Sequence, residues 1–232
     1  MTDSLPPSQE RFAGSDRINA LIHICLHYLS DQDKRRFIAQ FRNLPQDSDQ
    51  MMHTLRELVL GAYLASTGIA VRYQAPIDGK TPDWSLFKEG RPAGYIDLLN
   101  FHIDKETETQ IEDQQQSRGV AAYWRDGNKD NATRLFHALQ KKALHYSELA
   151  EATALPWAIA LFPEFLAAVD FAEDVLPTLV DPDSGIFASY PSLSGLLYFE
   201  EASGTYFFKY APSPFARMSL MLSDGQFPPR AA

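Results

Sequence analysis

Hydrophobic residues near the start of the chain recur every three or four positions, which is the spacing of one face of a helix. The first such face is formed by Ile18, Leu21, Ile22, Cys25 and Leu29. This pattern predicts a helix that begins at Ser15 or Asp16. A second amphipathic helix is predicted over residues 31–43. A third is predicted from residue 48 or 49 to Gly68, because glycine is typical of the position after a helix end.

After residue 68 the pattern changes to an alternation of apolar and polar residues, which is typical of strands. The apolar stretches are IAVRYQAPI, DWSLF and GYIDLLNFHI, and the turn sequences IDGK and KEGRP separate them. The chain therefore predicts a helix followed by three strands between about residues 50 and 100.

The second half of the chain alternates between polar and apolar stretches. Residues 106–131 are polar and Gln-rich, which fits either a short helix with a loop or a mobile flap. A helix over residues 131–151 follows, then a buried strand in LPWAIALF and another helix in PEFLAAVDFAEDVL. Residues 194–210 alternate on both sides of the turn residues Ala202, Ser203 and Gly204, and they predict a hairpin.

Together these elements predict an α/β fold, in which a central mixed sheet is flanked by helices, with an N-terminal helical hairpin and a C-terminal β-hairpin. The chain has 232 residues, of which 45% are hydrophobic, so it can bury a sizeable core. We expect a single domain over residues 15–222, with disordered tails at 1–14 and 223–232.

Two features of the sequence bear on location. No stretch reaches the roughly 18 uninterrupted apolar residues of a transmembrane helix, and the polar N-terminus does not resemble a secretory signal. The single cysteine, Cys25, cannot form an internal disulfide. We therefore expect a cytoplasmic protein with no membrane partner.

Charge is distributed unevenly along a chain whose net charge is −9. Residues 143–208 contain ten acidic residues and no Lys or Arg. The basic residues before them include Lys34, Arg35, Arg36, Arg118, Arg125, Lys129, Arg134, Lys141 and Lys142. A nucleic-acid partner is therefore expected to meet the N-terminal two-thirds. The alternative is that these residues form ordinary solvated helix faces.

The predicted C-terminal hairpin carries the aromatic sequences LLYFEE and YFFKY. Exposed aromatic strands of this kind can pair with another chain. The hairpin is therefore a candidate edge for a homodimer or another protein partner.

Three carboxylates fall on the predicted helix and strands between residues 50 and 100. Glu57 lies in an apolar part of the third helix, Asp83 precedes the second strand, and Asp97 interrupts the apolar third strand. An acid in such surroundings is costly unless it is paired, protonated or near a cation. Two carboxylates from adjacent strands can hold Mg²⁺, which prefers oxygen ligands. A bound metal ion can in turn activate a water molecule for attack on a phosphodiester.

This arrangement resembles the PD-(D/E)XK superfamily of restriction-endonuclease-like nucleases. Glu57, the sequence Thr81-Pro82-Asp83, and Asp97-Leu98-Leu99 are similar to that family's helix glutamate, PD and (D/E)XK elements. The resemblance implies a nuclease-like core at about residues 50–162, with Asp83 and Asp97 as Mg²⁺ ligands and Glu57 as a supporting acid.

Leu99 stands where the family motif has its lysine, on the face of the strand that Asp97 shares. Members of the superfamily can supply this lysine from another element. Lys142 is the candidate substitute, and Lys141 is the reserve. The catalytic candidates are therefore Glu57, Asp83, Asp97 and Lys142.

Other interpretations remain open for the same residues. Asp83 can cap a turn, Asp97 can be a buried acid bonded to the backbone, Glu57 can pair with Arg72 or Arg91, and Lys142 can lie on a helix surface. The chain is then either a Mg²⁺-dependent hydrolase of nucleic acid or a nuclease-like module without catalysis that binds or regulates a partner. A third possibility is an α/β domain unrelated to nucleases.

Weaker signals accompany these candidates. His23 and His27 have the spacing of a helical zinc pair, but no third ligand is evident. Cys25 lies on the apolar helix face and is expected in the core.

Overall fold

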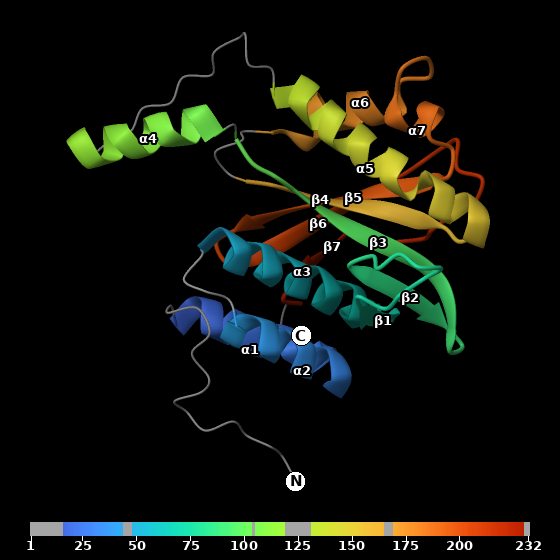
Figure 1. The fold of residues 1–232 in the computed structure, drawn as a ribbon, viewed down its shortest axis with the longest axis horizontal. Helices are drawn as coiled ribbons and strands as arrows, with labels where there is room; N and C mark the ends of the chain where they lie inside the picture. The colour runs from blue at the N-terminus through green and yellow to red at the C-terminus, as the bar shows by residue number, and fades with distance from the viewer. Residues whose placement is uncertain (1–15, 44–47, 104, 119–130, 165–168, 230–232) are drawn as a thin grey trace. The chain divides into compact units, whose positions relative to one another are not determined.

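A computed structural model describes residues 16–43, 48–103, 105–118, 131–164 and 169–229 (Figure 1). The chain divides into two compact units. Unit 1 comprises Met1–Leu98, Glu201–Lys209 and Leu222–Ala232, and unit 2 comprises Leu99–Glu200 and Tyr210–Met221. The three carboxylates from the sequence all belong to unit 1.

The described residues form α/β structure with one mixed sheet, in which the strands are hydrogen-bonded in the order β1 to β7. The strands are β1 (Ala70–Tyr73), β2 (Trp84–Lys88), β3 (Arg91–Phe101), β4 (Trp157–Pro163), β5 (Leu193–Ala202), β6 (Thr205–Pro212) and β7 (Gly225–Phe227). Strands β1 to β3 pair antiparallel, as do β6 and β7, whereas β4 and β5 are parallel. The predicted mixed α/β sheet is thus confirmed.

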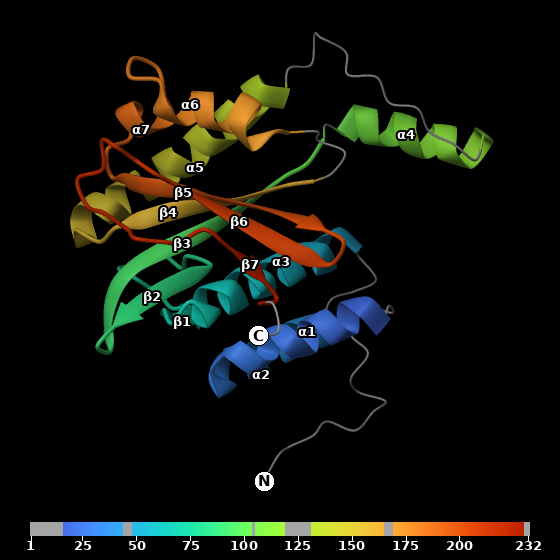
Figure 2. The ribbon, with the colours of Figure 1, turned by 180° about the vertical axis from the view of Figure 1, so that it is seen from behind.

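Three helices begin unit 1: α1 (Asp16–Tyr28), α2 (Asp31–Asn43) and α3 (Ser48–Ser66). Both ribbon views place α1 alongside α3, and α3 also packs against β1 and β7 (Figures 1 and 2). The end of α3 follows from Gly68, whose positive φ of 87° suits a residue without a side chain. The backbone N–H of Ile69 then donates to the Leu64 carbonyl at 3.3 Å and closes the helix end.

The core of unit 1 is built around the indole of Trp84, which is 0% exposed. The centroid of its ring lies 5.9 Å from that of Phe37 and 5.3 Å from that of Tyr73. Gly61 on α3 makes room for it, because a Cβ at this position would fall 1.9 Å from the indole. The indole Nε1 donates to the Glu57 carbonyl at 2.9 Å. The same packing therefore joins α3 to the start of β2.

Unit 2 contains α4 (Lys105–Arg118), α5 (Asn131–Thr153), a π-helix (Phe171–Val175), α6 (Leu176–Val180) and α7 (Ile186–Ser189). Every residue of β4 is buried. The helix α5 covers this strand and also contacts the π-helix and α7. At the far end of β4, the Glu164 N–H donates to the Phe101 carbonyl at 2.9 Å, so β3 and β4 end side by side.

Two segments differ from the sequence predictions. Residues 225–227, expected in a disordered tail, form β7 on β6, and Phe227 is 0% exposed because it packs into unit 1. The helix expected over PEFLAAVDFAEDVL differs where the structure describes it, since Pro163 ends β4 and a π-helix begins at Phe171. Residues 165–168 of this segment lie outside the described residues. The side chain of Asp170 caps that π-helix by accepting the N–H groups of Ala172 and Glu173.

Several predictions from the sequence concern residues that the structure does not describe. The tail at 1–14 and residues 119–130, which include the basic residues Arg125 and Lys129, lie outside the described residues. The prediction of one domain over residues 15–222 stays a prediction. Within the described ranges, no helix combines the length and apolar character needed to cross a membrane.

Candidate functional site

Asp83 and Asp97 lie at the point where β2 and β3 begin to pair. Trp84 is opposite Ile96 in the antiparallel register, so the residue before Trp84 comes opposite Asp97. The Leu98 N–H donates to Asp83 Oδ2 at 2.7 Å, and the Asp83 N–H donates to Asp97 Oδ1 at 3.2 Å. Each carboxylate is therefore fixed by the backbone of the other strand.

Asp97 is 5% exposed, whereas Asp83 is half-buried. A buried carboxylate is costly unless donors compensate for lost water, and the Asp83 N–H supplies such a donor. Burial raises the pKa of the neighbouring Tyr95 hydroxyl, and the charge of Asp97 raises that pKa further. The carboxyl group of Asp97 thus lies inside the fold, beside the Tyr95 hydroxyl.

Glu57 faces the same part of unit 1 from α3 and is 5% exposed. Its Oε2 accepts the Tyr73 hydroxyl at 2.6 Å, and its Oε1 lies 3.1 Å from His53 Nε2, one helical turn earlier. Among the residues that the structure describes, these partners replace the pairing with Arg72 or Arg91 considered from the sequence.

Tyr73 connects Glu57 electrostatically with Asp83. Burial raises the pKa of the Tyr73 hydroxyl above its ordinary range, and the charge and hydrogen bond of Glu57 raise it further. The charge of Asp83 adds a smaller contribution in the same direction. The charges of both acids therefore act on one buried hydroxyl, so the carboxylates belong to one neighbourhood of unit 1. We call Glu57, Asp83 and Asp97 the acidic cluster.

Lys142 and Leu99 belong to unit 2. Lys142 lies on α5 with a half-buried side chain, and Leu99 lies on β3 and is also half-buried. The role of Lys142 as the displaced lysine stays a prediction.

The donor set can be compared with what Mg²⁺ requires. Carboxylate oxygens are the hard ligands that Mg²⁺ prefers, and this ion keeps several waters when one or two carboxylates bind it. Asp83 and Asp97 fit that requirement. The described part of the chain contains no group of three or more His, Cys, Asp or Glu side chains arranged to hold a metal ion. A site here would therefore use two carboxylates and water.

The weaker sequence signals lie on α1. His23 and His27 are both exposed. Cys25 is 0% exposed, and burial raises the pKa of its thiol far above the ordinary value. The expectation that Cys25 is a core residue is confirmed.

The sequence did not point to Tyr73, His53 or Gln40 as partners of the cluster. His53 could have been found, because it lies four residues before Glu57 on one helix. Gln40 Nε2 donates to the Tyr73 hydroxyl oxygen at 3.1 Å across segments that lie far apart in the chain. No local pattern predicts that contact.

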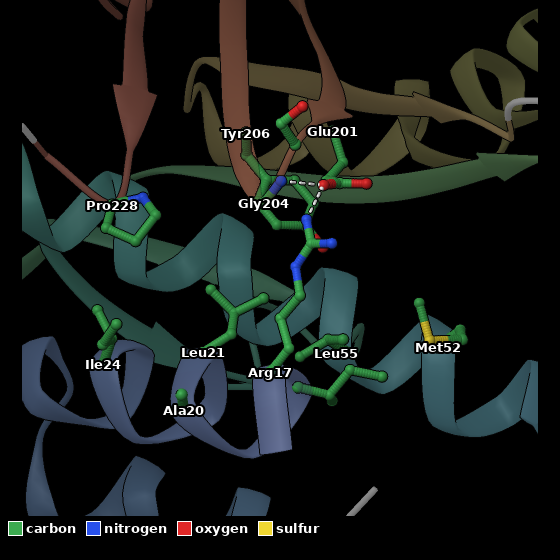
Figure 3. Close-up of a pocket in the computed structure, with 12 residues that line it drawn as sticks. Arg17, Ala20, Leu21, Ile24, Met52, Leu55, Glu201, Gly204, Tyr206 and Pro228 are labelled. Carbon is green, nitrogen blue, oxygen red and sulfur yellow. Dashed lines mark hydrogen bonds and ion pairs between the residues drawn. The ribbon is translucent and has the colours of Figure 1, made fainter. Parts of the chain in front are cut away.

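Unit 1 also contains a pocket of about 580 Å³ (Figure 3). Its apolar wall includes Leu21 and Ile24 from α1 and Leu55 from α3. At its rim Arg17 reaches from α1 to Glu201, with Nη2 and Oε1 2.9 Å apart. None of its lining residues belongs to the acidic cluster, so the pocket is a separate feature.

Comparisons with known proteins identify no relative from which a function could be inferred. No protein-family model matches the sequence. No curated protein and no solved structure is significantly similar to it.

Proposed function

We propose that this protein is a divergent nuclease of the PD-(D/E)XK type, a Mg²⁺-dependent phosphodiesterase that acts on nucleic acid. The observation that carries the proposal is the pair of opposed carboxylates, Asp83 and Asp97, each bonded to the backbone of the other strand. Such bonds hold two hard oxygen donors in place before a cation arrives, which lowers the cost of binding it.

The order of elements supports a nuclease-like core at about residues 50–162. A helix, α3, precedes three antiparallel strands, and β4 is the next strand in the sheet after β3. Glu57, Asp83 and Asp97 follow one another along these elements in the order of the family motif that the sequence resembles. Metal bound there would supply a Lewis acid and an activated water for attack on the phosphodiester. Glu57 would support the site, and Lys142 would orient the attacking water.

Basic residues near the cluster support nucleic acid as the substrate. Arg35 and Arg36 on α2 are exposed, and Arg36 Nη1 donates to the Tyr73 carbonyl at 2.5 Å. The Arg36 guanidinium thus lies beside the backbone of Tyr73, whose hydroxyl contacts Glu57. Its charge could neutralise a phosphate of the nucleic acid.

Cleavage of labelled DNA and RNA by the full chain, with Mg²⁺ and with EDTA, tests the proposal. Asp97→Asn should abolish Mg²⁺-dependent cleavage, because an amide is a weaker metal ligand, while its oxygen can still accept the Asp83 N–H. Asp181→Asn is the matched control, since Asp181 also accepts backbone N–H groups but lies in unit 2. Equal cleavage by the wild type and Asp97→Asn would refute the assignment.

A second candidate is a nuclease-like module without catalysis that binds or regulates a partner. Leu99 favours it, because an aliphatic side chain replaces the lysine of the motif. Calorimetric titration with Mg²⁺ or Mn²⁺ separates the two candidates. Absence of binding near millimolar metal, together with no cleavage, supports the non-catalytic module.

A further inference from the structure

Tyr73 is the residue through which several elements of unit 1 reach the acidic cluster. It lies at the end of β1 and is 1% exposed. Its hydroxyl is 2.6 Å from Glu57 Oε2 and 3.3 Å from Gln40 Oε1. A hydroxyl has one proton, and the shorter contact to a charged acceptor is the stronger hydrogen bond. Tyr73 therefore donates to Glu57.

The other contacts of the hydroxyl support that direction. Gln40 Nε2 and Gln74 Nε2 lie 3.1 Å and 3.0 Å from the hydroxyl oxygen, and both amides can donate to it. Since amide donors engage the oxygen lone pairs, the proton is directed to Glu57. The raised pKa of Tyr73 keeps the hydroxyl protonated throughout the neutral range.

The helix α2 holds the backbone and ring of Tyr73 in place. Asp33 Oδ1 accepts the Tyr73 N–H at 3.1 Å, and Arg36 Nη1 donates to the Tyr73 carbonyl. The Phe37 ring packs with its centroid 4.1 Å from that of Tyr73. Backbone, ring and hydroxyl are each fixed by α2, so Tyr73 has little freedom to move away from Glu57.

Glu57 in turn is held at both ends of its carboxylate. His53 Nε2 contacts Oε1 at 3.1 Å, on the side opposite the Tyr73 contact. Removal of the Tyr73 hydroxyl would release one oxygen, and the carboxylate could then rotate about its remaining contact. An acid that supports a metal site by its position would lose that position.

We propose that Tyr73 is a positioning residue, which orients Glu57 in the active site and connects α2 to catalysis. This inference rests on the proposed nuclease function. It adds that the N-terminal helices, which lie outside the nuclease-like core, contribute to turnover through one hydroxyl.

Tyr73→Phe tests the inference, because it retains the ring and removes only the hydroxyl. We expect kcat for nucleic-acid cleavage to fall about 10- to 100-fold, the usual effect of removing an outer contact to a metal-site residue. KM for the nucleic acid should stay unchanged, since the Tyr73 hydroxyl is buried and contacts Glu57. Tyr63→Phe is the matched control: Tyr63 is equally buried, at 2% exposed, and bonds to the Ser223 carbonyl instead.

A double-mutant cycle shows whether Tyr73 acts through Glu57. Glu57→Asp keeps a carboxylate but shortens the side chain beyond reach of the hydroxyl. Adding Tyr73→Phe to Glu57→Asp should then cause no further loss, whereas independent effects would multiply. If Tyr73→Phe does not fold, Gln40→Met keeps the tyrosine and removes the amide that directs its proton. A lower kcat at unchanged KM is expected for this variant as well.

The outcomes separate this inference from the proposed function. A wild-type protein that neither binds Mg²⁺ nor cleaves nucleic acid would overturn both proposals. An active wild type with full kcat in Tyr73→Phe, or in Gln40→Met where that variant is used, overturns the role of Tyr73 alone. If the effects of Tyr73→Phe and Glu57→Asp on kcat multiply in the double-mutant cycle, the role of Tyr73 is also overturned, whereas the proposed nuclease function is not.

Discussion

The strand β4 and the middle of β3 are both buried, but only β3 carries an ionisable side chain in its buried part. All residues of β4 are buried and none is ionisable. In β3, Asp97 lies within a run of buried residues from Gly94 to Leu98. An apolar strand needs no further partner once it is covered, whereas a buried acid needs hydrogen bonds to offset lost hydration. A feature that lowers stability without improving packing is typical of a functional site.

The largest expected effect comes from placing an acid on β4, where no partner is prepared. Ala160 is 0% exposed, and a fully buried carboxyl has its pKa raised by about 3–5 units at about 1.4 kcal/mol each. Ala160→Asp should therefore reduce the free energy of unfolding by about 4 kcal/mol at pH 7, because the carboxyl becomes protonated once its pKa exceeds the pH. Urea denaturation measures this, with Ala39→Asp at an exposed position of α2 as control. Similar losses in the two variants would show that burial at Ala160 is not the cause of the loss.

A smaller loss is expected at the helix that supports the acidic cluster. Gly61→Ala would place a Cβ 1.9 Å from the Trp84 indole. Overpacking of this kind costs about 1–3 kcal/mol, and we expect the upper end because the ring is enclosed. Thermal denaturation shows whether Gly61→Ala lowers or raises the stability, and a lower melting temperature is expected. Without the clash, the same change would stabilise a helix interior by about 1 kcal/mol.

The burial of Asp97 can be tested by two substitutions, one that removes its hydrogen-bond acceptor and one that keeps it. Asp97→Ala removes the acceptor of the Asp83 N–H, so the free energy of unfolding should fall by about 1–3 kcal/mol. Asp97→Asn keeps a carbonyl oxygen for that N–H and should stay within about 1 kcal/mol of the wild type. Equal losses in denaturation would mean that the charge of Asp97, and not its hydrogen bond, stabilises β3.

Much of the fold could be predicted because its signals are local. The residues of α2 were predicted from amphipathic spacing alone. The turn between β2 and β3 follows from Glu89 and Gly90, whose φ values of 52° and 77° suit the sequence KEGRP. The strand β7 was missed because three residues beside prolines carry too little alternation, and its pairing with β6 is non-local.

In the acidic cluster too, the residues with a local sequence signal were predicted and the long-range contacts were not. Asp83 and Asp97 were found because each interrupts or flanks an apolar strand. The partners of Glu57 were not all found, because Tyr73 reaches it from a strand that follows α3, and Gln40 reaches Tyr73 from the preceding helix α2. Strand alternation predicts that Tyr73 points inward. It does not predict which carboxylate its hydroxyl meets.

The smallest expected effect concerns a buried polar group that stays neutral, Tyr63. Burial raises its pKa to about 12 from 10.0, and the charge of Asp224 contributes in the same direction. Because the folded-state pKa is the higher one, this contribution to stability is fully present below about pH 10. It is lost as the pH rises to about 12. Tyr63→Phe should cost about 1 kcal/mol at pH 7 through the lost bond to Ser223.

The melting temperature of Tyr63→Phe should therefore fall less steeply than that of the wild type between pH 10 and pH 12. Asp97→Asn should keep the wild-type slope in that range, because it leaves Tyr63 and its surroundings unchanged. Parallel slopes for Tyr63→Phe and the wild type would show that folding does not raise the pKa of Tyr63. The ionisation of a buried hydroxyl such as Tyr63 thus affects stability only at alkaline pH, whereas a buried carboxylate such as Asp97 needs its hydrogen bond at neutral pH.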